Sequence, residues 1–150
     1  DDMLVWIENT SLALWVGTSL WAYPLLLSIH ITGLAIIVGI FAIRDFHLVG
    51  VVSGLSVSNF LELKRLAYCG FMINGLSGIM LFSSQASYLA TNLPFLLKIF
   101  FIGLGMILAS QIHKKIGKKK EQTGLKKLAI LSMICWFGAI VAGRLIAYIF

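Results

Sequence analysis

Four long apolar stretches dominate the sequence, and polar or basic runs separate them. The stretches cover residues 19–43, 66–82, 95–112 and 128–149. Each is close to the roughly 20 residues that a helix needs to cross about 30 Å of hydrocarbon. Hydrocarbon offers a backbone amide no hydrogen-bond partner, and these runs are continuous where barrel strands would alternate. Each stretch is therefore predicted to be a transmembrane helix.

A shorter mixed segment precedes the first of these spans. Residues 3–16 place Trp6 and Trp15 among polar neighbours such as Glu8 and Asn9, a pattern typical of a helix that lies in the membrane interface. The predicted fold class is therefore all-α. We expect one transmembrane domain over residues 1–150, built as an integral membrane four-helix bundle with a short N-terminal interfacial helix.

Basic residues gather in two of the connecting segments. Residues 114–127 are rich in lysine, residues 44–65 include Arg44 and Arg65, and residues 83–94 carry no charge. The positive-inside rule places the two basic segments in the cytoplasm. Both termini and residues 83–94 are then expected on the outer side. The net charge of +6 is thus a topology signal, and nucleic-acid binding is not expected.

Composition narrows the classes of function. The chain is 59% hydrophobic and only 12% charged, which is typical of polytopic membrane proteins. We find no soluble domain that could hold an independent catalytic site, so any chemistry must use the bundle and its short loops. A non-enzymatic electron carrier or accessory subunit is therefore favoured over an enzyme. Cys69 and Cys135 lie in apolar segments and are interpreted as unpaired thiols.

His30 is the main candidate for a functional residue, because it lies in the middle of the first apolar stretch. Ionisable side chains at membrane depth are costly and usually face a bundle interior or a site. With a helical rise of 1.5 Å per residue, His30, Met80, Lys98 and Arg144 lie about 21, 22, 24 and 25 Å from the cytoplasmic boundary. These four side chains are therefore predicted to share one level in the outer part of the membrane.

A histidine, a methionine and two cations at one level of the membrane suggest a haem b site. Imidazole and thioether groups are axial ligands of haem iron, and cations pair with haem propionates. His30 is then the principal ligand, with Met80 and the cations Lys98 and Arg144 beside it, and Gly33 is expected to leave room for the macrocycle. Simpler interpretations remain: His30 hydrogen-bonds across helices, the two cations snorkel to the interface, and Met80 fills space.

His113 is a second candidate metal and cofactor ligand. It follows Gly105 and Ala109 at four-residue spacing, so a groove of small side chains leads to it on one helix face. Its estimated depth is close to the cytoplasmic edge, and an axial offset near 20 Å separates it from His30. Ligation of one metal by both histidines therefore requires shifted helix boundaries. His47 matches His113 in depth, so the two either hold a second metal or haem or are simply interfacial histidines.

Small and charged residues complete the picture. Gly70, Asn74 and Gly78 recur every four residues, which indicates close helix packing or, alternatively, close approach to a flat cofactor. Arg44 beside Asp45 is interpreted as a charge pair at the membrane boundary.

Several motifs together resemble an uncharacterised family of small bacterial four-helix membrane proteins. The likeness begins at Trp21-Ala22-Tyr23-Pro24 and Ser28-Ile29-His30 and covers nearly the whole chain. It continues through Gly33, Asp45, Gly50, Ser77-Gly78, Leu81-Phe82, Ser84, Ala86, Tyr88, Asn92, Phe95, Lys98, His113 and Gly143-Arg144.

The resemblance implies a multi-pass protein of the bacterial inner membrane with periplasmic termini, but no activity. This chain departs from the family pattern at Leu27, where the family has an acidic residue, at His47, where it has Arg, and near Ala109, where it has Asn. The shared polar set is then His30, Lys98, His113 and Arg144. Likeness to b-type cytochromes is only architectural.

Three functions follow as hypotheses. The first is a haem b-binding electron-transfer subunit of a larger membrane complex, with His30 as the principal ligand. The second is a non-catalytic accessory or scaffold subunit, and the third is a small transporter or proton-conducting element. The expected partners are the lipid bilayer and either other membrane subunits or further copies of this chain.

Overall fold

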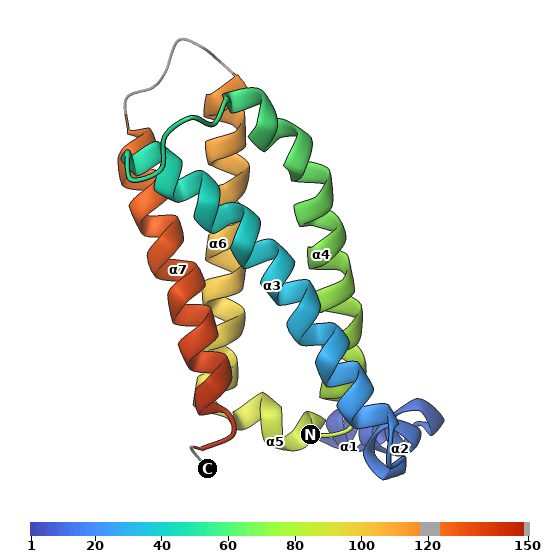
Figure 1. The fold of residues 1–150 in the computed structure, drawn as a ribbon. Coiled ribbons are helices and arrows are strands. Elements are labelled where there is room, and N and C mark those ends of the chain that lie inside the picture. Colours follow the sequence, from blue (N-terminus) through green and yellow to red (C-terminus); the bar gives the residue numbers. More distant parts are fainter. Residues whose placement is uncertain (118–123, 149–150) are drawn as a thin grey trace.

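The computed structural model describes residues 1–117 and 124–148, and its regular elements there are all helices (Figure 1). They are α1 (Asp2–Glu8), α2 (Ser11–Thr18), α3 (Ala22–Val49), α4 (Val57–Ser83), α5 (Ala86–Thr91), α6 (Leu93–Gly117) and α7 (Leu125–Leu145).

Four of these helices are long and apolar enough to cross a membrane. The candidate membrane-spanning parts are Ala22–Val49, Glu62–Ser83, Leu93–Ile116 and Leu125–Leu145. Large apolar side chains remain exposed on their outer faces, as lipid contact requires, among them Ile31, Ile79, Phe100 and Phe137. The chain is therefore an all-α protein with four candidate membrane-spanning helices packed as a bundle.

Local signals explain where two of the helices begin and end. The segment predicted as a single helix over residues 3–16 is divided into α1 and α2, because Thr10 caps α2 by accepting a hydrogen bond from Ala13 N at 3.3 Å. The first long helix continues past residue 43 to Val49. It ends at Gly50, whose φ of 95° is a left-handed conformation that glycine adopts without strain.

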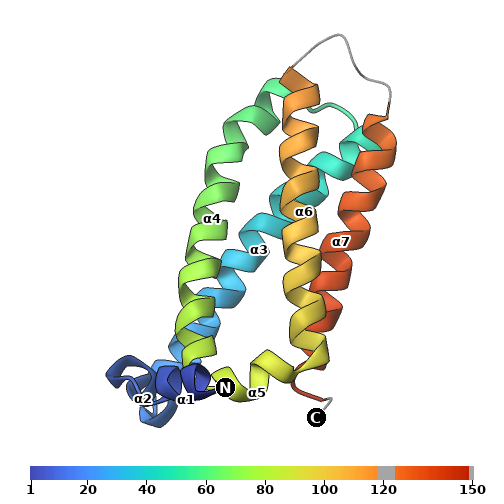
Figure 2. The same cartoon turned by 180° about the vertical axis from the view of Figure 1, so that it is seen from behind.

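The four long helices form two pairs. Helix α3 packs along α4, helix α6 packs along α7, and α3 also contacts α7. Both views show α3 crossing the bundle diagonally: it lies beside α7 near the α3–α4 connector and beside α4 at the opposite end (Figures 1 and 2). That opposite end also carries α1, α2, the end of α7 and α5, which links α4 to α6. The N-terminus and the end of α7 therefore lie at the same end of the bundle.

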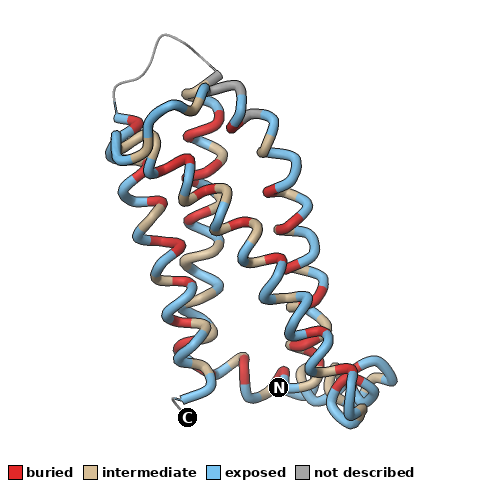
Figure 3. Tube along the Cα trace, in the orientation of Figure 1, coloured by how far each residue is buried: buried red, intermediate tan, exposed pale blue. Residues whose placement is uncertain are grey.

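Buried residues follow the inner faces of the helices (Figure 3). One core cluster consists of Ile37, Phe41, Ala67, Ala109 and Trp136. A second cluster, Val16, Leu26 and Leu81, joins α2, α3 and α4.

The closest helix contact occurs where Gly33 meets α4. A Cβ atom at Gly33 would lie 2.9 Å from both Asn74 N and Gly70 O, and one at Gly70 would lie 2.9 Å from Ile36 Cγ2. This geometry confirms that the small residues of α4 serve close helix packing. It contradicts the expectation that Gly33 leaves room for a macrocycle, because the backbone of α4 fills that space.

Candidate functional site

Polar side chains inside the bundle gather in two layers. The His30 layer consists of His30, Asn74, Ser77 and Lys98, and the Arg44 layer consists of Arg44, Asp45, His113 and Ser132. Since residue 44 follows residue 30 by fourteen positions along one helix, the two layers are separated by about 21 Å.

The His30 layer joins three helices. His30 on α3 is half-buried, and its Nδ1 lies 3.0 Å from Asn74 O and 3.2 Å from Ser77 Oγ on α4. Asn74 Nδ2 donates in return to His30 O at 2.8 Å. From α6, Lys98 Nζ reaches to 3.1 Å from His30 Nε2. The structure therefore brings together two of the residues that depth counting placed at one level.

The partners of His30 fix its tautomer. A backbone carbonyl can only accept, so Nδ1 carries the proton and donates it to Asn74 O. Nε2 is then unprotonated, and its lone pair accepts a hydrogen bond from the Lys98 ammonium. His30 is thus a neutral imidazole. The backbone of α4 orients the ring, and the lone pair of Nε2 points at the cation Lys98.

Lys98 spans the space between the helix pairs. A Cβ atom added at Gly143 of α7 would lie 3.4 Å from Lys98 Cδ and 3.7 Å from Nζ, so the lysine stem runs past this glycine to reach α3. The side chain is half-buried. Its long stem keeps other positions within reach of the ammonium group.

The other two residues predicted at this level make different contacts. Arg144 Nη2 donates to Tyr148 Oη at 3.0 Å, and the guanidinium lies 5.2 Å from the centre of that ring. Met80 packs against the cluster of Val16, Leu26 and Leu81. Their described contacts are therefore not with His30, although all three have similar depths.

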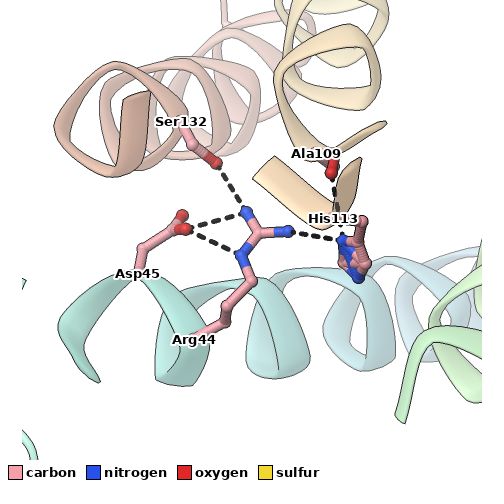
Figure 4. A network of polar contacts seen from close by, with 5 residues as sticks. All are labelled: Arg44, Asp45, Ala109, His113 and Ser132. Atoms are coloured by element: carbon pink, nitrogen blue, oxygen red, sulfur yellow. Dashed lines mark hydrogen bonds and ion pairs between the residues drawn. The ribbon is translucent and has the colours of Figure 1, made fainter. Parts of the chain in front are cut away.

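The Arg44 layer is an almost completely enclosed ion pair (Figure 4). Arg44 Nε and Nη2 donate to Asp45 Oδ1 at 3.0 and 2.7 Å, and Nη2 also donates to Ser132 Oγ on α7 at 3.2 Å. The exposed fractions of Arg44 and Asp45 are only 1% and 0%. The predicted boundary pair is therefore enclosed within the bundle, because α3 continues beyond it to Val49 and Ser132 of α7 contacts it.

His113 belongs to the Arg44 layer. Its Nδ1 lies 3.0 Å from Ala109 O and 3.4 Å from Arg44 Nη1, so it either donates to the carbonyl or accepts from the guanidinium, depending on the tautomer. The ring meets Phe41 edge-on at a centroid distance of 6.0 Å. Because His30 lies about 21 Å away along α3, the two predicted metal ligands are on separate levels.

His47 is also held separately from His113. Its Nδ1 donates to Val52 O at 3.0 Å, and its ring lies 5.2 Å from that of Phe60. Within residues 1–117 and 124–148, no group of three or more histidine, cysteine, aspartate or glutamate side chains could hold a metal ion. Both cysteines are free thiols, Cys69 exposed and Cys135 buried.

The residues of the His30 layer fit part of a haem site. An Nδ1–H bonded to a backbone carbonyl is the usual way in which proteins orient a ligating imidazole. However, Lys98 Nζ stands against Nε2, and His30 Cε1 is close enough that a Cβ at Gly78 would lie 3.1 Å from it. Neither Met80 nor His113 supplies a second ligand here. The layer therefore fits one axial ligand and one cation, and ligation would require Lys98 to move.

The comparisons with known proteins identify no relative. No family model, curated protein or solved structure matches this chain. The resemblance to a bacterial membrane family therefore remains a proposal, and the site has to be judged on its own geometry.

Sequence reasoning missed Asn74, Ser77 and Ser132 as partners and did not show that Arg44 and Asp45 are enclosed within the bundle. Asn74 had one detectable signal, because it interrupts the glycine stripe of α4 with a polar side chain. An Arg-Asp pair adjoining a long apolar run was a second signal. Nothing in the sequence points to Ser132, which joins the layer through the packing of α7.

Proposed function

We propose that this chain is a multi-pass protein of the bacterial inner membrane that binds one haem b at the His30 layer and passes electrons within a larger membrane complex. The supporting observation is the orientation of His30: Nδ1–H is bound to Asn74 O, so Nε2 is left as an electron-pair donor inside the bundle. The basic connectors are assigned to the cytoplasm and α1, α2 and α5 to the periplasmic side. Lipid surrounds the spans, and other subunits or further copies of this chain complete the complex.

The residues of the His30 layer would have different roles in binding haem. When bound, haem supplies one-electron chemistry at its iron. His30 Nε2 would ligate the iron, and the bond from Nδ1–H to Asn74 O would keep the ring in place and increase its basicity. Lys98 would have to leave the imidazole, and its ammonium group would then pair with a propionate.

The decisive experiment is a visible absorbance spectrum. The full chain is expressed with an adequate haem supply, purified in detergent, and measured oxidised and reduced. We expect a Soret band that is lost in His30→Ala and retained in His47→Ala, because His47 bonds to Val52 and packs on Phe60 away from the layer. A parent protein without a Soret band would refute the proposal.

A non-catalytic accessory subunit is the second candidate. The observation in its favour is that polar side chains of both layers form hydrogen bonds within the chain, namely those of His30, Lys98, Arg44 and Asp45. Under this function, His30→Ala alters the size of the native complex on a native gel of solubilised membranes, and no absorbance band depends on His30.

Transport or proton conduction has the least support. Ile37 and Phe41 belong to an apolar core cluster and lie between positions 30 and 44 of α3. A proton path between the two layers would have to cross this cluster. Proton flux into liposomes that disappears in His30→Ala would be needed to revive this function.

A further inference from the structure

Basic side chains gather at the end of the bundle where α4 and α7 begin and α6 ends (Figure 1). Those that the structure describes are Lys64, Arg65, Lys114, Lys115, Lys126 and Lys127. All are exposed except Lys115, which is half-buried. Among the described residues only Arg44 and Asp45 form an ion pair, so no described acid neutralises any of these six cations. The described part of this end is therefore an uncompensated positive surface.

Three of the six cations meet where α7 begins. Lys126 and Lys127 lie in the first turn of α7, which holds no acidic side chain. Lys115 reaches across from the last turn of α6: a Cβ atom added at Gly124, the residue before α7, would lie 3.6 Å from Lys115 Nζ. We call Lys115, Lys126 and Lys127 the α7 lysine cluster.

The two lysines of α7 lie above a row of exposed apolar side chains on the same helix. These side chains, the α7 apolar stripe, are Ile130, Leu131, Ile134 and Phe137. They follow Lys126 and Lys127 and one another at spacings of three, four and seven residues, which place them on one helix face. The opposite face of α7 is buried in the bundle, with Ala129, Ser132 and Trp136. Cations at the end of the bundle thus continue directly into a surface suited to lipid.

This order of charge and apolar surface matches one class of molecule. A phospholipid carries its phosphate directly above its acyl chains, and basic residues next to a membrane span attract anionic headgroups. A zwitterionic lipid brings no net charge to offset the cluster. A free anion would use the lysines but not the apolar stripe.

We propose that this face of α7 binds an anionic phospholipid, with its phosphate at the α7 lysine cluster and an acyl chain along the α7 apolar stripe. The headgroup contacts come from two helices, because Lys115 belongs to α6. Haem has no part in this site, since the His30 layer lies nearer the opposite end of the bundle. Failure of haem binding would therefore leave the lipid site intact, and the reverse also holds.

Native mass spectrometry of the full chain in detergent tests the site. The protein is titrated with phosphatidylglycerol and, separately, with phosphatidylcholine that has the same acyl chains but no net charge. We expect phosphatidylglycerol to bind about tenfold more tightly or better. The double variant Lys126→Gln with Lys127→Gln should lose most of this preference. Its affinity for phosphatidylcholine should be unchanged, which also shows that the variant is folded.

Lys64→Gln with Arg65→Gln is the matched control, because it removes two exposed charges from the same end of the bundle but from α4. Its preference for phosphatidylglycerol should stay close to that of the parent chain. Equal binding of the two lipids by the parent chain, or a preference retained in Lys126→Gln with Lys127→Gln, would overturn the site. So would an equal loss in both double variants, or displacement of the lipid by inorganic phosphate.

Discussion

The two polar layers hold their charges in different ways. In the Arg44 layer, opposite charges sit on neighbouring residues, and both side chains are fully enclosed. In the His30 layer, the only charged member is Lys98, which is half-buried and bound to a neutral imidazole. The same bundle therefore contains one layer built on charge pairing and, about 21 Å away along α3, another in which the cation has a replaceable partner.

This difference separates a structural site from one that can change partners. An enclosed ion pair costs much when it is broken, because one charge is left without compensation. The His30 layer is instead positioned by the backbone contact at Gly33, while Lys98 reaches in from a flexible stem. The proposed function therefore places its ligand at His30, whereas Arg44 is expected to matter for folding.

The largest effect should come from breaking the Arg44 pair. Replacing Arg44 by Met leaves the Asp45 carboxylate enclosed without its cation, and we expect the free energy of unfolding to fall by about 3–5 kcal/mol. Chemical unfolding in mixed micelles, followed by circular dichroism, measures this change.

The double variant is the control for this prediction. Arg44→Met with Asp45→Leu removes both charges, and burial of apolar groups should recover most of the loss. If the double variant is as unstable as Arg44→Met, the guanidinium acts through its shape and its bond to Ser132, and charge pairing is not what holds the layer.

A smaller effect is expected from crowding the helix crossing at the His30 layer. In Gly33→Ala the new methyl would lie 2.9 Å from backbone atoms of Asn74 and Gly70, so the helices must separate, at a cost of about 1–3 kcal/mol. Gly39→Ala on the same helix is the matched control, because a Cβ there meets nothing within 4 Å. It should stabilise α3 by up to about 1 kcal/mol. Equal unfolding energies for the two variants would contradict the role given to Gly33.

Hydropathy and helical rise predicted part of this structure and could not predict the rest. Four apolar runs were enough to indicate four spanning helices, because length and hydrophobicity decide whether a segment can cross a bilayer. Counting 1.5 Å per residue also placed Lys98 near the depth of His30. Depth alone does not say, however, which way a side chain points around the helix axis. Arg144 and Met80 have similar depths but make their contacts elsewhere.

The Arg44 layer could not be assembled from the sequence for the same reason. Its members come from three helices, and their meeting depends on how α3 crosses α7 and on which face α6 presents. The first span was also predicted to end at residue 43, whereas the helix runs on to Val49. Hydropathy falls at a charged pair whether that pair is solvated or enclosed.

The smallest effect is expected from the cation of the His30 layer. Lys98→Met removes one hydrogen bond to a neutral imidazole and keeps an unbranched side chain beside Gly143. We therefore expect the free energy of unfolding to change by about 1 kcal/mol or less, well below the effect of the same replacement at Arg44. Unfolding the two variants side by side tests the comparison. If Lys98→Met lowers the free energy of unfolding as much as Arg44→Met, then Lys98 holds the helices together. A hydrogen bond of that strength could not be broken to let a ligand reach His30 Nε2.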